Sequence, residues 1–207
     1  MVGMTSSARV YAGVEGDRRR AERRAQLIDA GLDLLGAPDG EPALSVRGVC
    51  KHAGLATRYF YESFTDRDAL TVAVYDHAVE RIAATTLRAI AEAPQAERAV
   101  VRAAVATIVR EISGDPRLGR LLFSGPVNSV LAHKRLESAR MFAGLTTAQA
   151  VDFYDLPAGP DVDLVAHFVV GGFAQILTAW LDEVLEIDPD ALVERCTDLM
   201  LAVAAAR

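Results

Sequence analysis

The 207-residue chain has few of the residues on which catalysis and metal binding usually depend. It contains two cysteines and four histidines, and no two histidines stand four residues apart, as they do in a helical zinc site. The sequence also lacks a glycine-rich phosphate loop, a serine nucleophile elbow and the Glu-x-x-His pairs of di-iron bundles. These absences argue against an enzyme with catalytic residues, against a cofactor and against a zinc or iron site.

No positively charged and then apolar leader opens the chain, so a secreted protein is not expected. Residues 1–17 are mostly polar or small and predict a disordered tail. Cys50 and Cys196 lie far apart at apolar helix positions, which is typical of buried thiols in a reduced cytoplasmic protein.

Strand-like alternation is also scarce, whereas apolar residues make up 51% of the sequence and recur at helical spacing. The sequence therefore predicts an all-α fold. Two short helices are expected between residues 45 and 63, and longer ones at 18–36, 66–93, 97–113, 116–123, 128–154, 162–186 and 189–206. We divide the chain into the tail at 1–17, an N-terminal three-helix domain at 18–70 and a second helical domain at 71–207.

The segment from Ser45 to Leu70 carries the clearest local signal. Ser45 is a good N-cap, and apolar residues follow it at helical spacing: Val46, Val49, Cys50 and Ala53. Gly54 ends this short helix where a left-handed residue is favoured, and Leu55 anchors the turn. The pattern predicts a helix followed by a tight turn.

The second short helix, about Thr57 to Ser63, is too aromatic for an ordinary exposed helix. Phe60 and Phe64 share a face with Leu55 and are expected in the core. Four polar side chains are left to point outward: Thr57, Arg58, Tyr59 and Tyr61. Such side chains bind base edges and phosphates, so the segment predicts a helix-turn-helix whose second helix enters the major groove of DNA.

This segment resembles the DNA-binding domain of the TetR (tetracycline repressor) family of bacterial regulators. The family's usual pattern is a glycine turn, a short helix ending in aromatic, Tyr, two variable residues and Phe, and then a polar, a basic and an acidic residue that open a long helix. This chain has matching residues at Gly54, Phe60, Tyr61, Phe64, Asp66, Arg67, Asp68 and Leu70. The residues expected to contact DNA are Arg47, Thr57, Arg58, Tyr59, Tyr61 and Arg67.

The chain departs from the family pattern at Ala56, Arg58 and Ser63, where serine, a small residue and an aromatic are common. Gly48 also stands inside the first short helix, at a cost of about 1 kcal/mol relative to alanine. These departures bear on the operator sequence rather than on the ability to bind DNA.

The net charge of −6 is unusual for a DNA-binding protein. Residues 1–70 carry 10 basic and 10 acidic side chains, so the acidity belongs to residues 71–207, which carry 12 and 18. An arginine cluster precedes the motif: Arg18, Arg19, Arg20, Arg23 and Arg24. This cluster is equally consistent with phosphate contacts and with a solvated helix face.

The helix at 162–186 is nearly apolar on every side from Leu164 to Leu181, so it is expected to be buried on every side. A membrane span is an alternative, but acidic flanks and the internal His167 and Gln175 argue against it. One stripe of this helix suits a cavity wall, and another suits close packing against a partner helix. The resemblance implies that helices 162–186 and 189–206 form a homodimer interface and that earlier helices enclose a ligand pocket.

Six residues are candidates for the lining of such a pocket: Thr107, Phe123, Met141, His167, Gly171 and Gln175. Each has a structural alternative, because the polar members can be satisfied core groups and the large apolar ones ordinary core.

These features together predict a ligand-responsive transcriptional regulator in the cytoplasm, without a membrane partner. We expect a homodimeric repressor that binds a palindromic double-stranded DNA operator and is released by a small, largely apolar effector. The alternative is a helical small-molecule-binding or protein-interaction module without functional DNA binding.

Overall fold

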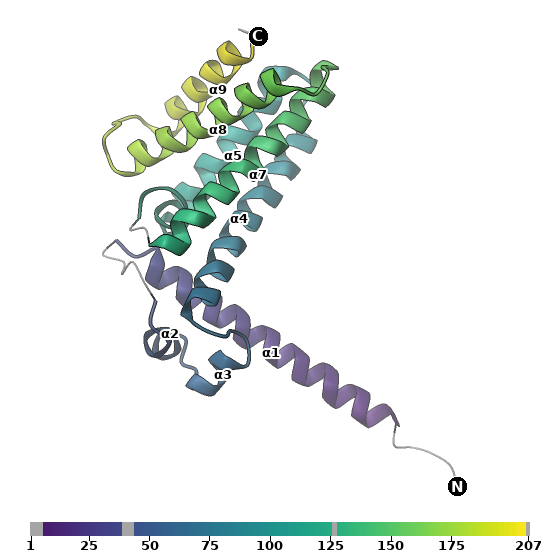
Figure 1. The fold of residues 1–207 in the computed structure, drawn as a ribbon, viewed down its shortest axis with the longest axis vertical. Helices are drawn as coiled ribbons and strands as arrows, with labels where there is room; N and C mark the ends of the chain where they lie inside the picture. Colours follow the sequence, from purple (N-terminus) through teal and green to yellow (C-terminus); the bar gives the residue numbers. More distant parts are fainter. Residues whose placement is uncertain (1–5, 39–43, 126–127, 206–207) are drawn as a thin grey trace.

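A computed structural model describes residues 6–38, 44–125 and 128–205 of the chain. All regular structure in these ranges is helical, as predicted, and no strand occurs among them. Figure 1 shows a small unit of helices α1 to α3 at one end of the molecule and a bundle of helices α4 to α9 at the other. Helix α4 runs from the small unit into the bundle, so the two parts share it.

Helix α1 (Ser6–Leu35) is longer than the predicted helix, which began at Arg18. Residues 6–17, which the sequence analysis assigned to a disordered tail, are therefore helical, and residues 1–5 of that tail lie outside the described ranges. The extension contains no proline, and adding residues to an existing helix costs much less than nucleating one. Leu27, Ile28 and Leu35 of this helix are buried.

The helix-turn-helix has the predicted caps and core. Helix α2 (Val46–His52) begins at Ser45, whose Oγ accepts a hydrogen bond from the backbone N–H of Gly48 at 3.1 Å. Gly54 has a φ of 66°, the left-handed conformation expected of the turn. Helix α3 (Thr57–Tyr61) follows, with Phe60 fully buried and Phe64 nearly so.

Helix α4 (Arg67–Glu92) begins at Asp66, whose carboxylate accepts a hydrogen bond from the backbone N–H of Ala69 at 2.8 Å. Its first half buries Leu70 and Val74 in the core with α1, and the helix also packs against α5 and α7. The prediction of one uninterrupted helix from the motif into the second domain is confirmed.

The bundle continues with α5 (Glu97–Gly114), α6 (Pro116–Gly119), η1 (Arg120–Ser124), α7 (Ser129–Tyr154), α8 (Pro160–Leu181) and α9 (Pro189–Ala205). Helix α8 packs on α7, and α9 packs on α5. The helix predicted at 116–123 is divided into one α-helical turn and one π-helical turn. The backbone N–H of Gly125 closes the π-helical turn on the carbonyl of Arg120.

Helix α8 differs from its prediction in length and in burial. It ends at Leu181 because Glu183 adopts a left-handed φ of 58°, and the N–H groups of Val184 and Leu185 both turn back to the carbonyl of Ala179. By length and composition alone α8 could cross a membrane, yet only 11% of its most apolar 18-residue window is buried. The expectation of burial on every side is therefore wrong for the single chain.

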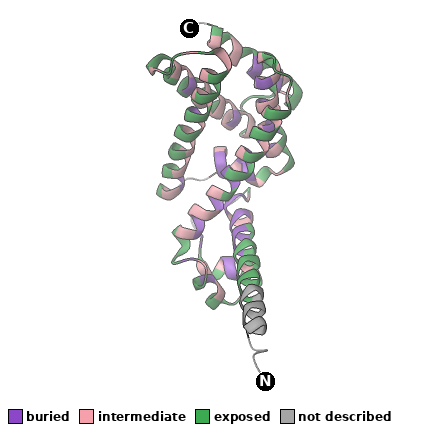
Figure 2. Ribbon diagram, turned by 90° about the vertical axis from the view of Figure 1, so that its right-hand side faces the viewer, coloured by how far each residue is buried: buried purple, intermediate pink, exposed green. Residues whose placement is uncertain are grey.

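Buried residues concentrate where the α1–α3 unit meets α4, as Figure 2 shows. At this junction the close approach of α1 to α4 requires a glycine. A Cβ on Gly31 would lie 2.6 Å from Cγ2 of Val74, a fully buried side chain that is stiff about χ1.

We predict that Gly31→Ala lowers the free energy of unfolding by roughly 1–3 kcal/mol, because the added methyl overpacks the α1–α4 contact. Urea denaturation followed by circular dichroism measures the change. Gly114→Ala is the matched control, since Gly114 is also helical but has no heavy atom within 4 Å of the added Cβ. Equal effects of the two substitutions would contradict the role given to Gly31.

Candidate functional sites

The outer surface of the helix-turn-helix carries the residues predicted to contact DNA. Arg47, Thr57, Arg58, Tyr61 and Arg67 are exposed, and Tyr61 keeps 61% of its surface accessible although its ring packs edge-on against Phe60. Figure 1 places α2 and α3 at the end of the molecule remote from α8 and α9. These side chains are therefore accessible, and three of the five are arginines.

Tyr59 differs from the prediction, because it is half-buried between two guanidinium groups instead of pointing freely outward. The Arg23 guanidinium lies 4.5 Å from the centre of the Tyr59 ring, and that of Arg58 lies 4.7 Å from it. Arg58 also donates a hydrogen bond to the Tyr59 hydroxyl at 2.8 Å. Tyr59 thus orients Arg58 on the surface of α3.

The arginine cluster of α1 contacts α3, a role that neither alternative of the sequence analysis included. Arg20 donates to the backbone carbonyl of Glu62, the residue that caps the C-terminus of α3. Arg23 donates to the Glu62 carboxylate at 2.9 Å, and the Arg24 guanidinium lies 5.2 Å from the Phe64 ring centre. A cation at a helix C-terminus satisfies free carbonyls and complements the helix dipole. The i, i+3 spacing of Arg20 and Arg23 places both on one face of α1, and this spacing was the sequence feature that could have indicated a shared contact.

A second charged cluster joins the α1–α3 unit to the bundle. Asp33 of α1 accepts hydrogen bonds from Arg117 of α6 and from His52 of α2, the latter at 2.8 Å. Arg117 also donates two hydrogen bonds of 2.8 Å to Asp115. Asp33 therefore contacts one element on each side of the junction.

The ion pairs of this junction hold its carboxylates ionised. Burial opposes ionisation of Asp33, but hydrogen bonds from Arg117 and His52 outweigh burial and lower the pKa of Asp33. The hydrogen bond from Arg117 lowers the pKa of Asp115, and the two carboxylates together raise the pKa of Arg117.

The π-helical turn η1 links this junction to the interior of the bundle. Arg120 donates a hydrogen bond to the backbone carbonyl of Gly36, just beyond the end of α1. On the other side, Arg135 of α7 donates to the carbonyl oxygens of η1 and its cap: Leu121 at 2.8 Å, Arg120 at 3.2 Å and Gly125 at 3.3 Å. The turn is thus held between the end of α1 and helix α7.

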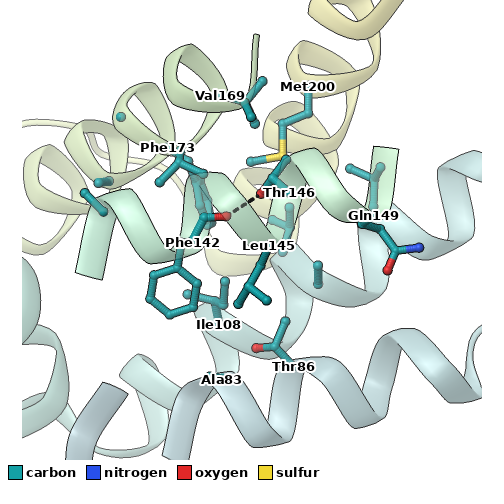
Figure 3. Close-up of a pocket in the computed structure, with 18 of the residues that line it drawn as sticks. Ala83, Thr86, Ile108, Phe142, Leu145, Thr146, Gln149, Val169, Phe173 and Met200 are labelled. Carbon is teal, nitrogen blue, oxygen red and sulfur yellow. Dashed lines mark hydrogen bonds between the residues drawn. The ribbon is translucent and has the colours of Figure 1, made fainter. Parts of the chain in front are cut away.

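A largely apolar cavity of about 490 Å³ lies inside the bundle, within the size range of small-molecule sites. Its wall is built by η1 and helices α4, α5, α7, α8 and α9. In Figure 3, Ile108, Phe142 and Leu145 lie on this wall, with Thr86 of α4 below them and Phe173 of α8 above. The arrangement suits a ligand whose surface is mostly hydrocarbon.

The cavity contains three of the six residues predicted to bind a ligand, namely Phe123, Gly171 and Gln175. Thr107 is fully buried elsewhere on α5, where its hydroxyl accepts a hydrogen bond from Arg110. Met141 is 42% exposed and does not line the cavity, and the His167 ring bonds to the carbonyl of Asp163 at 2.8 Å. A helical period groups residues by face, but it does not indicate which face meets the cavity.

The cavity has few polar groups, and sequence reasoning identified only Gln175 among them. Tyr75 bonds to Ser138 at 2.8 Å, and its burial raises the pKa of the phenol. Thr86 is buried and its Oγ1 has no hydrogen-bond partner. Arg135 supplies the cationic part of the lining, and Glu97, which accepts a hydrogen bond from Tyr154, supplies the acidic part. None of these residues stands in a sequence pattern specific to ligand binding.

Helices α8 and α9 present an apolar surface on the outside of the bundle. Leu164 and Phe168 of α8 are 69% and 66% exposed, Leu199 of α9 is 56% exposed, and Gly172 of α8 is exposed as well. Large apolar side chains gathered at this density are typical of an interface.

We predict that acid weakens the junction between the α1–α3 unit and the bundle. The folded-state pKa values of Asp33 and Asp115 are lowered, so their stabilising contribution is present above the ordinary value of 3.8 and is lost as pH falls through the lowered values. Asp33→Asn removes part of this contribution, so its melting temperature should fall less than that of the wild type between about pH 5 and pH 3. Differential scanning calorimetry at several pH values measures the melting temperatures of both proteins.

Asp152→Asn is the matched control, because Asp152 is an exposed aspartate on α7 outside this junction. If Asp33→Asn and Asp152→Asn followed the same pH profile, Asp33 would not contribute to the acid response.

No protein-family model matches the chain. Over 87 residues, 42% of this chain and 44% of the relative, it is 38% identical to the HTH-type transcriptional regulator BetI of Burkholderia mallei (strain NCTC 10229). An uncharacterised HTH-type regulator of Haemophilus influenzae is 39% identical over 67 residues, 32% of each chain. The chain thus matches less than half the length of these curated relatives.

Solved structures extend the similarity to most of the chain. The fatty acid degradation regulator FadR from Bacillus halodurans superposes with a TM-score of 0.70 at 19% identity, covering 86% of this chain and 94% of FadR. FadR from Bacillus subtilis, solved in complex with stearoyl-CoA, superposes with a TM-score of 0.66 at 19% identity. The match covers 85% of this chain and 96% of that FadR. A TetR-like regulator from Rhodococcus sp. RHA1 superposes with a TM-score of 0.66 at 16% identity, and the match covers 89% of this chain and 97% of that regulator. The resemblance that the helix-turn-helix motif indicated is confirmed, and the chain has the fold of the TetR-family transcriptional regulators.

Proposed function

We propose that the protein is a cytoplasmic, ligand-responsive transcriptional repressor that binds a palindromic operator as a homodimer. The observation that carries the proposal is the physical connection between an exposed helix-turn-helix surface and an apolar cavity through α4 and the Asp33–Arg117 junction. Similarity to transcriptional regulators supports the same conclusion. A small, largely apolar effector enters the cavity and releases the protein from DNA.

The DNA contacts divide by chemistry. Arg47, Arg67 and the Tyr61 hydroxyl bind phosphates and set the orientation of the domain, whereas Thr57 and Arg58 reach base edges at the N-terminal end of α3. Tyr59 restrains the Arg58 guanidinium through its ring and hydroxyl contacts. A guanidinium held in this way loses less conformational freedom when it binds a base.

The release of DNA depends on movement between the two parts of the chain. Tyr75 and Thr86 of α4 line the cavity, while the N-terminus of the same helix, capped by Asp66, directly follows the helix-turn-helix. A ligand that fits the cavity better in one position of α4 and η1 shifts the population toward that position. The second position no longer presents both recognition helices at the spacing of one DNA turn, about 34–36 Å.

The homodimer forms through α8 and α9. Their exposed apolar surface, which includes Leu164, Phe168 and Leu199, supports this arrangement, because a second copy removes that surface from water. The same contact accounts for a helix as apolar as α8 with so little of it buried in one chain.

We predict that the purified protein binds the DNA upstream of its own coding sequence. Arg58→Ala should weaken this binding by about 5- to 150-fold, the effect of losing a base contact worth roughly 1–3 kcal/mol. Tyr61→Ala should weaken binding as well, because it removes a phosphate contact. Fluorescence anisotropy across a salt titration measures both affinity and its salt dependence.

Arg88→Ala is the control, since Arg88 is an exposed arginine in the bundle half of α4. Absence of salt-sensitive binding by the wild-type protein would favour the module without functional DNA binding. Equal losses in Arg58→Ala and Arg88→Ala would contradict the surface proposed for DNA.

We predict that Leu164→Asp with Phe168→Asp converts the dimer into monomers, because two carboxylates placed in an apolar interface must be desolvated without partners. Size-exclusion chromatography with light scattering should show the mass fall from twice 22.2 kDa to that value. Leu136→Asp is the control, since Leu136 is 50% exposed on α7. A monomeric wild-type protein would refute the dimer.

A further inference from the structure

Arg135 is the cationic residue in the wall of a largely apolar cavity. Its Nη2 group donates hydrogen bonds to three backbone carbonyls of η1 and its cap, which satisfies one side of the guanidinium. Its Nε is buried and has no hydrogen-bond partner. Arginine carries five N–H donors and is charged at all physiological pH values, so part of this group is left for another acceptor.

No carboxylate in the described part of the chain pairs with Arg135. Burial lowers the pKa of its guanidinium, and the group that acts in the opposite direction is the Tyr75 phenol rather than an acidic side chain. The acidic residue of the cavity wall, Glu97, is bound by Tyr154 and lies at the start of α5. A partly buried charge without a counterion is unfavourable, so an anion is favourable beside Arg135.

The rest of the cavity defines the shape of the ligand. Tyr75, which bonds to Ser138 one helical turn beyond Arg135, and Thr86 are eleven residues apart on α4, a separation of about 16 Å along the helix. Most of the remaining wall is apolar and includes Ile108 and Phe142 (Figure 3). The cavity therefore suits a long ligand with a charge at one end.

We propose that the cavity binds an elongated apolar carboxylic acid whose carboxylate pairs with Arg135 and whose chain extends along α4 toward Thr86. The inference rests on the proposed ligand-binding role of this bundle and adds the chemical class of the ligand. Arg135 is the cation of the described lining, so the site matches a monovalent anion, and the planar guanidinium matches a planar carboxylate.

The contact between the ligand and Arg135 also connects the ligand to the junction between the bundle and the α1–α3 unit. A carboxylate on Arg135 competes with the carbonyls of η1 for the guanidinium N–H groups. η1 continues directly from α6, where Arg117 pairs with Asp33 of α1. The anion is thus connected to α1, the helix that contacts α3, through the Arg135–η1 and Arg117–Asp33 hydrogen bonds.

The test uses the purified full chain with dodecanoate and dodecanol, which have the same chain length and differ in charge. Isothermal titration calorimetry should show dodecanoate binding about tenfold more tightly than dodecanol or better, which corresponds to 1.4 kcal/mol. In Arg135→Met this preference should disappear, while the affinity for dodecanol stays within about threefold of the wild type. Arg135→Lys should retain a preference for dodecanoate because it keeps the positive charge.

Arg110→Met is the matched control, because it removes an exposed arginine of α5 that does not line the cavity and should leave the preference intact. Equal affinity of the wild type for the two probes, failure of both to bind, or a preference unchanged in Arg135→Met would each overturn the inference. The wild-type comparison stands even if a variant fails to fold.

Operator binding is measured separately in the presence of dodecanoate. Carboxylate-dependent binding without any change in DNA affinity would uphold the ligand class and contradict the proposed release of DNA. Failure to bind DNA at all, with the dodecanoate preference intact, would contradict the repressor function alone.

Discussion

The packing of α1 against α4 is the contact on which the rest of the molecule depends. α4 contributes Leu70 and Val74 to the core of the helix-turn-helix unit and Tyr75 and Thr86 to the wall of the cavity, without a break in its backbone. Gly31 lets α1 approach this helix closely enough to bury the side chains between them. Because no flexible linker intervenes, a displacement of α4 at the cavity moves the base of the DNA-binding unit.

Apolar packing alone does not set the orientation of helices as short as α3 and α6. Arginine contacts with α1 help to orient both helices. Arg20 and Arg23 bind the C-terminal end of α3, a helix of five residues with little buried surface of its own. Arg117 binds Asp33 and Asp115 where α6 meets α1. Exposed ion pairs add little stability individually, but paired guanidinium contacts restrict geometry. The charged contacts therefore help to fix how the helix-turn-helix is held relative to the bundle.

The bundle carries more apolar surface than one chain can bury. Part of it faces the cavity, where side chains from six elements leave about 490 Å³ unfilled, and part lies outside on α8 and α9. An unfilled apolar cavity and an exposed apolar face both cost stability in the isolated chain. In the proposed function, a ligand and a second copy of the chain each remove one of these costs, and the stability of the bundle then depends on what it binds.

Local sequence determined the helices and the motif. The caps at Ser45 and Asp66, the left-handed Gly54 and the buried Phe60 and Phe64 all depend on neighbours within a few residues, so periodicity and capping rules identify them. The sequence also identified one face of α8, through Gly171 and Gln175, as a candidate cavity wall. Only the tertiary structure decided that Arg23 packs on Tyr59, that Arg117 reaches Asp33 and that Arg135 lines the cavity. These contacts join residues from different helices, and the partner of a long side chain depends on where the helices cross, which helical periodicity does not encode.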